Sequence, residues 1–230
     1  MTVSGESQAR SAARGLRQHD HCAHADHATE QLGYALDVLE ARGELDPDSP
    51  EAEAFVQGYI KDVTMHEVGH TLGLRHNFRS SRAYTEAQLA DPAFTAAHGI
   101  AGSVMEYAAL NLAAPGTPSA QQGTVFNTTI GPYDYWAIEY AYRPLLADQE
   151  AAELAKIAAR SAEPELAFGT DEDNGFGVDP ETLQGDLGTD VVAFARKRIA
   201  IARDLLARQE TRTLPADQDC AVLRRSVTYA

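Results

Sequence analysis

The sequence has few cysteines, few basic residues and no long apolar run, and each shortage excludes a class of protein. Its 230 residues include only Cys22 and Cys220, too few for a disulfide framework. Those two can pair only if the fold brings both ends of the chain together, which the sequence leaves open. No apolar stretch reaches the roughly 18 residues of a membrane-spanning helix. With 19 Lys and Arg against 34 Asp and Glu, the net charge of −15 would repel nucleic-acid phosphates. We therefore expect no membrane span and no nucleic-acid partner.

The first residues lack the apolar core of an export signal. Residues 2–8 are polar, so we expect no signal peptide in this chain. Residues 1–20 show no clear periodicity and are predicted to form a loose tail. Histidines and aspartates cluster at residues 19–27. A second metal site is one interpretation of this cluster, and we favour the other, a helix entry with exposed imidazoles.

A group of histidine, glutamate and glycine residues occurs at fixed spacing between residues 66 and 76. His66 and His70 are four residues apart, so on a helix both can reach one tetrahedral Zn²⁺. Glu67 lies beside the first of them and can act as general base on a water at the metal. Gly73 can end the helix in a left-handed conformation and let His76 turn back as third ligand. Three protein ligands leave one position open, which predicts a catalytic zinc site rather than a structural one.

Two less favoured interpretations of these histidines remain. Ordinary surface or core histidines would have no need of the accompanying Glu67 and Gly73. A structural zinc would need a fourth protein ligand, for which His98 or Cys22 is the candidate.

The motif resembles that of the metzincin clan of zinc metallopeptidases, in which a methionine turn follows downstream. Met105 in the stretch Ser-Val-Met-Glu-Tyr is the sole candidate, because the other two methionines are Met1 and Met65. The resemblance implies that Met105 lies under the zinc as an apolar floor. It also implies that Tyr107 reaches the zinc and helps to hold the oxyanion. The alternative for Tyr107 is a packed ring with a solvated hydroxyl.

Further segments resemble a bacterial family that carries the EcxA-type zinc-binding domain, a group of largely uncharacterised metalloproteases. These segments lie at residues 76–81, 131–140 and 168–173. The resemblance extends from about residue 22 to about residue 206. It implies peptide-bond hydrolysis, a peptide or protein substrate, and a secreted or periplasmic location. We therefore predict a zinc-dependent metalloendopeptidase in which zinc activates water and Glu67 is the general base.

Local patterns predict a mainly α-helical protein. Apolar periodicity and capping residues indicate helices at residues 28–42, 50–73, 133–142, 148–160 and 189–208. Ser49 is expected to cap the second of these and Pro50 to begin it. In the helix at residues 133–142, we expect Trp136, Ile138 and Tyr140 to pack against the zinc helix, that is, the helix at residues 50–73 that carries two of the predicted ligands. A short strand at residues 124–130 is a weaker possibility.

We expect residues 21–144 to form the metzincin-like catalytic core and residues 145–230 a helical extension packed on the same domain. One departure from the metzincin pattern stands out. Metzincins carry a sheet upstream of the zinc helix, and its edge strand holds the substrate. The 65 residues before His66 read as helical, so this sheet is predicted to be missing. The alternative function is therefore a zinc-binding fragment, inactive alone, whose partner is the N-terminal part of a longer protein.

The acidic, glycine-rich segment at residues 171–179 has two interpretations. Its oxygens could bind Ca²⁺, but the EF-hand pattern fails because Gly175 stands at a ligand position. A solvated acidic loop is the interpretation we favour.

Overall fold

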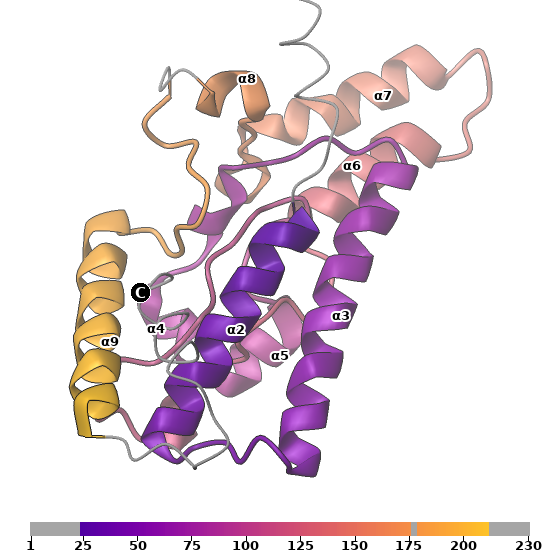
Figure 1. The fold of residues 1–230 in the computed structure, drawn as a ribbon. Helices are drawn as coiled ribbons and strands as arrows, with labels where there is room; N and C mark the ends of the chain where they lie inside the picture. Colours follow the sequence, from indigo (N-terminus) through magenta and orange to yellow (C-terminus); the bar gives the residue numbers. More distant parts are fainter. Residues whose placement is uncertain (1–23, 176–178, 212–230) are drawn as a thin grey trace, which may run out of the picture.

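The computed structural model describes residues 24–175 and 179–211, and this part of the chain is mainly α-helical, as predicted, with no β-strand (Figure 1). In chain order the α-helices are α2 (His24–Arg42), α3 (Pro50–Thr71), α4 (Glu86–Leu89), α5 (Pro92–His98), α6 (Pro132–Tyr142), α7 (Glu150–Ala159), α8 (Asp171–Asn174) and α9 (Val191–Thr211). Short 3-10 helices are η1 (Ser80–Ala83), η2 (Ser119–Gln121), η3 (Arg160–Ala162) and η4 (Pro164–Leu166).

Helix α2 lies between α3 and α9 and packs against both (Figure 1). The largest core cluster forms around it. Its buried members come from α2, from α9 and from the loop after α5, and include Tyr34, Val38, Leu110, Leu112, Phe126, Ile201 and Leu205. Helix α3 adds the partly buried Phe55 and Tyr59. A second cluster joins the loop region to the C-terminal segment through Tyr84, Leu89, Ile100, Leu187 and Phe194. Residues beyond position 145 therefore share both clusters with residues before it.

Helix α3 is the longest described helix, and local residues set both of its ends. The Ser49 hydroxyl accepts a hydrogen bond from the backbone N–H of Ala52 at 3.2 Å, and Pro50 occupies the first helical position. The helix ends at Thr71, and Gly73 follows with a φ of +84°. Only a residue without Cβ adopts this left-handed conformation without strain. The predicted cap and the predicted glycine turn are both confirmed.

The only regular element between α5 and α6 is the short η2, so the short strand considered at residues 124–130 is not formed. Side-chain amides take the place of a strand ladder there. The Asn127 Oδ1 atom accepts hydrogen bonds from the backbone N–H groups of Ile100 and Ala101 at 3.0 and 3.2 Å. The Asn111 side chain donates to the Leu89 carbonyl at 2.7 Å. Buried polar backbone is thus satisfied without a sheet.

Helix α6 forms where expected, but its predicted partner is wrong. It packs mainly against α7 and η4 rather than along α3. The Trp136 indole N–H donates to the Ile157 carbonyl of α7 at 2.7 Å, and Tyr140 is exposed. Its link to the zinc helix is at one end, where the Tyr142 hydroxyl donates to the Leu72 carbonyl at 2.9 Å.

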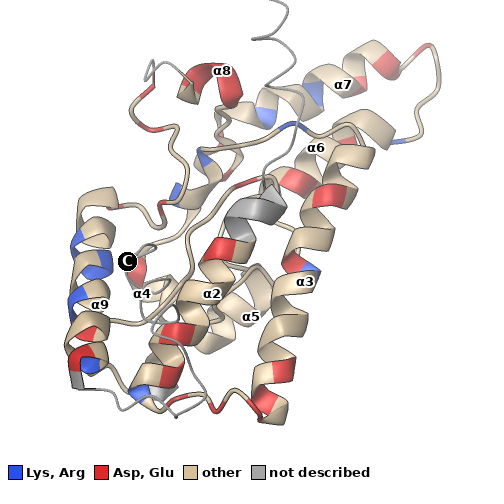
Figure 2. Ribbon diagram, in the orientation of Figure 1, with Lys and Arg blue, Asp and Glu red and all other residues tan. Residues whose placement is uncertain are grey.

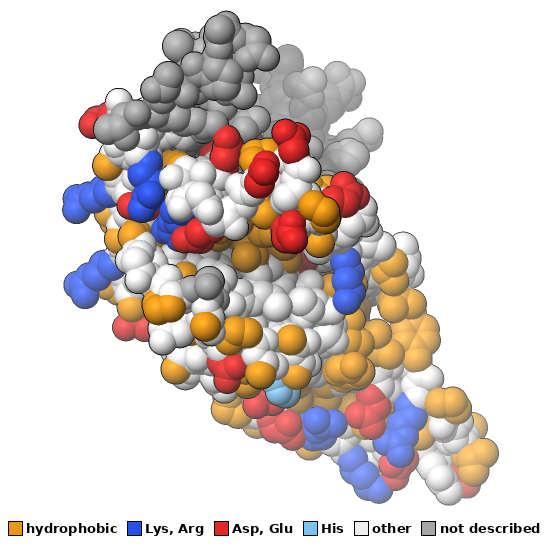
Figure 3. Space-filling view, turned by 90° about the horizontal axis from the view of Figure 1, so that it is seen from below, with side chains coloured by type: hydrophobic (Ala, Val, Ile, Leu, Met, Phe, Trp, Pro, Cys, Tyr) orange, Lys and Arg blue, Asp and Glu red, His pale blue; other side chains and the backbone are white. Residues whose placement is uncertain are grey.

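The described surface carries charges of both signs. Seen from below, acidic and basic side chains are interspersed with apolar ones (Figure 3). In the described residues, no helix combines the length and apolar character that crossing a membrane requires.

Candidate metal centre

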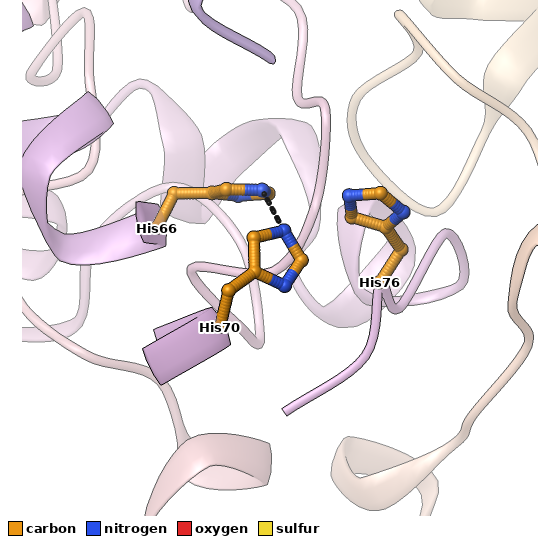
Figure 4. A group of neighbouring side chains, drawn as sticks. All are labelled: His66, His70 and His76. Carbon is orange, nitrogen blue, oxygen red and sulfur yellow. Dashed lines mark hydrogen bonds between the residues drawn. The ribbon is translucent and has the colours of Figure 1, made fainter. Parts of the chain in front are cut away.

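The structure brings His66, His70 and His76 together (Figure 4). The first two project from the last turns of α3, and the third lies on the segment after Gly73. Each ring offers one nitrogen, and these three atoms lie within 4.8 Å of one another. In the described part of the chain, no other group of three His, Cys, Asp or Glu residues is arranged in this way. His66 is fully buried, whereas His70 is half-buried.

The Nδ1 atom of each histidine is held by an oxygen that can only accept a hydrogen bond. These pairs are His66 with the Val104 carbonyl at 2.7 Å, His70 with the Leu74 carbonyl at 3.0 Å, and His76 with the Asp171 carboxylate at 2.9 Å. Each Nδ1 must therefore carry the proton of its neutral ring. The Nε2 atom of each ring is left with a lone pair.

The Nε2 atoms face one another. Those of His66 and His70 are 3.1 Å apart (dashed line in Figure 4), and two lone pairs at this distance repel unless a proton or a cation lies between them. Ligands of a tetrahedral zinc at 2.0–2.1 Å are about 3.3 Å apart. The donor set and the spacing of His66 and His70 both fit zinc.

Met105 lies directly beneath this part of α3. It is fully buried, and a Cβ atom added to Gly69 would collide with its sulfur. Gly69 stands between His66 and His70 in the helix, so the methionine underlies the turn that presents both rings. The resemblance implied a place under the zinc itself; the structure shows Met105 under the helical turn that carries two of the predicted ligands.

The Tyr107 hydroxyl reaches the same cluster. Its oxygen lies 3.2 Å from His76 Nε2, and the tyrosine is only 6% exposed. Because Nδ1 of His76 is already a donor, the phenol can donate its proton to the Nε2 lone pair. The residue is thus not a packed ring with a solvated hydroxyl.

A family model described as Met-zincin matches residues 48–230. The chain belongs to the Met-zincin family. Membership in this family points to a zinc-dependent metalloprotease and agrees with the grouping of the three histidines. No curated protein and no solved structure matches the chain.

Two buried carboxylates hold the methionine turn of this Met-zincin, and the sequence analysis did not identify either. Asp134 of α6 accepts hydrogen bonds from the Ser103 hydroxyl at 2.5 Å and from the backbone N–H groups of Val104 and Gly131 at 2.9 and 2.7 Å. Burial raises the pKa of Asp134, and these hydrogen bonds oppose the rise. Asp134 therefore holds the N–H side of Val104, the residue whose carbonyl orients the predicted ligand His66. The sequence did contain a sign of this role: Asp134 stands three residues after Gly131 at the start of a helix, the position from which an acidic side chain accepts a hydrogen bond from the backbone N–H of the capping residue.

Glu106 is the second of these carboxylates. It accepts from the Ser81 backbone N–H at 2.9 Å, the Ser80 hydroxyl at 3.2 Å and the Tyr107 backbone N–H at 3.1 Å. Burial raises the pKa of Glu106 well above its usual value, and the nearby Asp186 adds to the rise. Two of these partners belong to η1, so Glu106 ties the residue after Met105 to that 3-10 helix.

The acidic segment after residue 170 has a different role from the one we favoured. Asp171 begins α8 and is half-buried, with its carboxylate on His76, so the solvated-loop prediction is wrong for this residue. Burial is the largest single influence on the pKa of Asp171 and raises it. The hydrogen bond and the electrostatic attraction of His76, together with hydrogen bonds from the Asp171 N–H and the Thr170 hydroxyl, outweigh burial, and the pKa is lowered. Glu172 is engaged with Arg75 at 2.7 Å. In the described part of the segment, no three acidic side chains are grouped closely enough to hold a metal ion.

His98, the other candidate ligand within the described residues, is not grouped with these three histidines. His98 ends α5, and its ring lies against Phe94 with centroids 4.5 Å apart. Cys22, Cys220 and the side chains of the histidine cluster at residues 19–27 lie outside the described residues. Glu67 follows His66 on α3 and is half-buried.

Proposed function

We propose that this Met-zincin is a zinc-dependent metalloendopeptidase of the EcxA-like type. In this proposal His66, His70 and His76 hold Zn²⁺, Glu67 is the general base, and Tyr107 assists at the oxyanion. The observation that carries it is the arrangement of the imidazoles: three Nδ1 atoms are committed as donors, and three Nε2 lone pairs converge. Such an arrangement favours a cation at the centre.

Zinc bound in such a site lowers the pKa of a water toward about 7 and polarises a carbonyl group. The Glu67 carboxylate accepts the proton of the attacking water and returns it to the departing amine nitrogen as the C–N bond breaks. Its position next to His66 on a rigid helix supports this role.

The Tyr107 hydroxyl donates a hydrogen bond to the substrate carbonyl oxygen as negative charge develops on it. This role is supported by the burial of the hydroxyl and by its 3.2 Å distance from His76 Nε2. A phenol that hydrogen-bonds a ligand nitrogen before the reaction needs only a small movement to reach the oxygen.

A second candidate function is a zinc-binding module of a larger protein that is inactive alone. It is favoured by the secondary structure, because the described residues contain no strand that could pair with an extended peptide beside the histidines. In that case the partner is the N-terminal part of a longer protein, which would supply the sheet.

We propose residues 21–144 as the catalytic core and 145–230 as its helical extension in either case. A secreted or periplasmic location also remains a proposal.

Digestion of fluorescent casein distinguishes the two functions. The zinc-loaded protein is expected to cleave casein, to lose activity with a chelator, and to regain it when zinc is added back. Glu67→Gln should bind zinc with unchanged stoichiometry and lose at least about 100-fold in turnover, as expected for a general base.

Each alternative outcome has a separate meaning. Zinc binding without cleavage would support the inactive module. Full activity of Glu67→Gln would remove Glu67 from its role. Failure of the wild-type chain to bind zinc at one equivalent would overturn the metal centre itself.

A further inference from the structure

The three histidines of the triad are oriented by groups of different kinds. His66 and His70 are held by backbone carbonyls, which no side-chain substitution can remove. His76 alone is held by a side chain, that of Asp171, which is 95 residues away in the sequence. His76 also differs in its backbone, because it lies after the end of α3 and has no helix to fix its direction.

We propose that Asp171 is the positioning residue for His76, and that the segment around it is a structural part of the zinc site. A carboxylate that accepts the Nδ1–H proton fixes the tautomer, directs Nε2 to the centre and makes that nitrogen a better donor to a metal. This inference rests on one part of the proposed function, namely that His66, His70 and His76 together bind zinc.

Hydrogen bonds from the backbone and from the Asn77 side chain hold the segment before Asp171 against the segment after His76. The Phe78 N–H donates to the Gly169 carbonyl at 2.7 Å. The Asn77 side chain donates to the Ala167 carbonyl at 3.0 Å and accepts from the Gly169 N–H at 3.2 Å. Asn77 and Phe78 are both fully buried. The two segments therefore form one unit, and His76 and Asp171 lie at its end.

These two segments can approach each other closely because residue 169 is a glycine. A Cβ atom on Gly169 would collide with the Thr182 hydroxyl and lie 2.9 Å from Arg79 Cγ. A larger residue would push the segment away from Arg79, and the carboxylate two residues later would move with it.

The Asp171 carboxylate is itself fixed in place. Its Oδ2 atom accepts from the Thr170 hydroxyl at 3.2 Å, and the Thr170 N–H donates to Asp173 at 3.0 Å in a capping box. Arg75 reaches Oδ2 at 3.6 Å and pairs more closely with Glu172. The described part of α8 is strongly acidic (Figure 2), yet only Asp171 touches His76.

Zinc affinity, measured by competition with a chromophoric chelator, tests the proposal on the full chain. Asp171→Ala is expected to weaken zinc binding by about 10- to 100-fold. Glu172→Ala is the matched control. It removes one negative charge from the next position, but the Glu172 side chain does not contact His76, so this variant should retain wild-type zinc affinity. Asp171→Asn keeps an acceptor oxygen and should recover most of the loss.

A second measurement separates positioning from a general structural role. In the zinc-free protein, the imidazole nitrogen spectrum should show His76 protonated at Nδ1 in wild type and Glu172→Ala, and shifted toward Nε2–H in Asp171→Ala. The backbone amide spectrum away from residues 76 and 171 should be unchanged.

Equal zinc affinities and an unchanged His76 tautomer in Asp171→Ala would overturn the proposal. An equal loss in Glu172→Ala would overturn it too, because charge alone would then explain the effect. If the wild type binds no zinc, the proposed function fails, while the tautomer of His76 still decides the role of Asp171.

Discussion

Gly58 and Gly69 lie in the same helix, α3, and offer a paired test of how closely the methionine turn is packed against it. Both have ordinary helical backbone, so alanine at either position gains helix propensity of about 0.5–1 kcal/mol. Their surroundings differ. A Cβ on Gly58 would meet Phe126 at 3.6 Å, an ordinary contact.

At Gly69 the new Cβ would collide with the Met105 sulfur. It would also make ordinary contacts with Met105 Cε at 3.5 Å and Leu74 Cδ1 at 3.7 Å. Met105 is fully buried, so it has little room to move aside. Overpacking of this kind costs about 1–3 kcal/mol, and a collision with a fully buried atom lies at the upper end. After the propensity gain is subtracted, Gly69→Ala should lower the free energy of unfolding by about 2 kcal/mol. Gly58→Ala should raise it by up to about 1 kcal/mol.

Denaturant unfolding of the zinc-free chain measures both values, so metal binding does not enter. A double variant supplies the internal control. Met105→Ala alone should cost about 2–5 kcal/mol because it leaves a cavity. With the sulfur gone, adding Gly69→Ala should cause no further loss of stability. The reasoning is refuted if Gly69→Ala stabilises the wild-type chain as Gly58→Ala does.

Two other predictions concern Tyr107 and Asp62. Tyr107→Phe should keep zinc stoichiometry and lower the turnover of casein by about 100-fold or more, as loss of an oxyanion donor does; unchanged turnover would remove the hydroxyl from the mechanism. Burial raises the pKa of Asp62 on α3 to about 7, against hydrogen bonds from Asn127. The folded state then keeps a proton that the unfolded chain loses above about pH 4. Stability should therefore fall by a few kcal/mol at most as the pH rises from about 4 to about 7. Asp62→Asn should flatten this part of the pH profile of zinc-free unfolding, and an unaltered slope would contradict the assignment.

The parts of this protein that its sequence determined are those encoded within a few helical turns. The Ser49 cap, the left-handed Gly73 and the four-residue spacing of His66 and His70 all act on neighbouring residues, and each is present in the structure. The position of Met105 beneath the helix followed from a family resemblance rather than from such local physics.

Only the tertiary structure decided which groups surround the histidines. Asp134, Glu106 and Asp171 contact partners about 25–95 residues away. Sequence periodicity records which face of a helix is apolar, but not which distant element covers it, and for this reason the partner of α6 was also predicted wrongly. A carboxylate in a charged segment looks solvated until the fold buries it against one imidazole, because its pairing partner is set by chain topology and not by its neighbours.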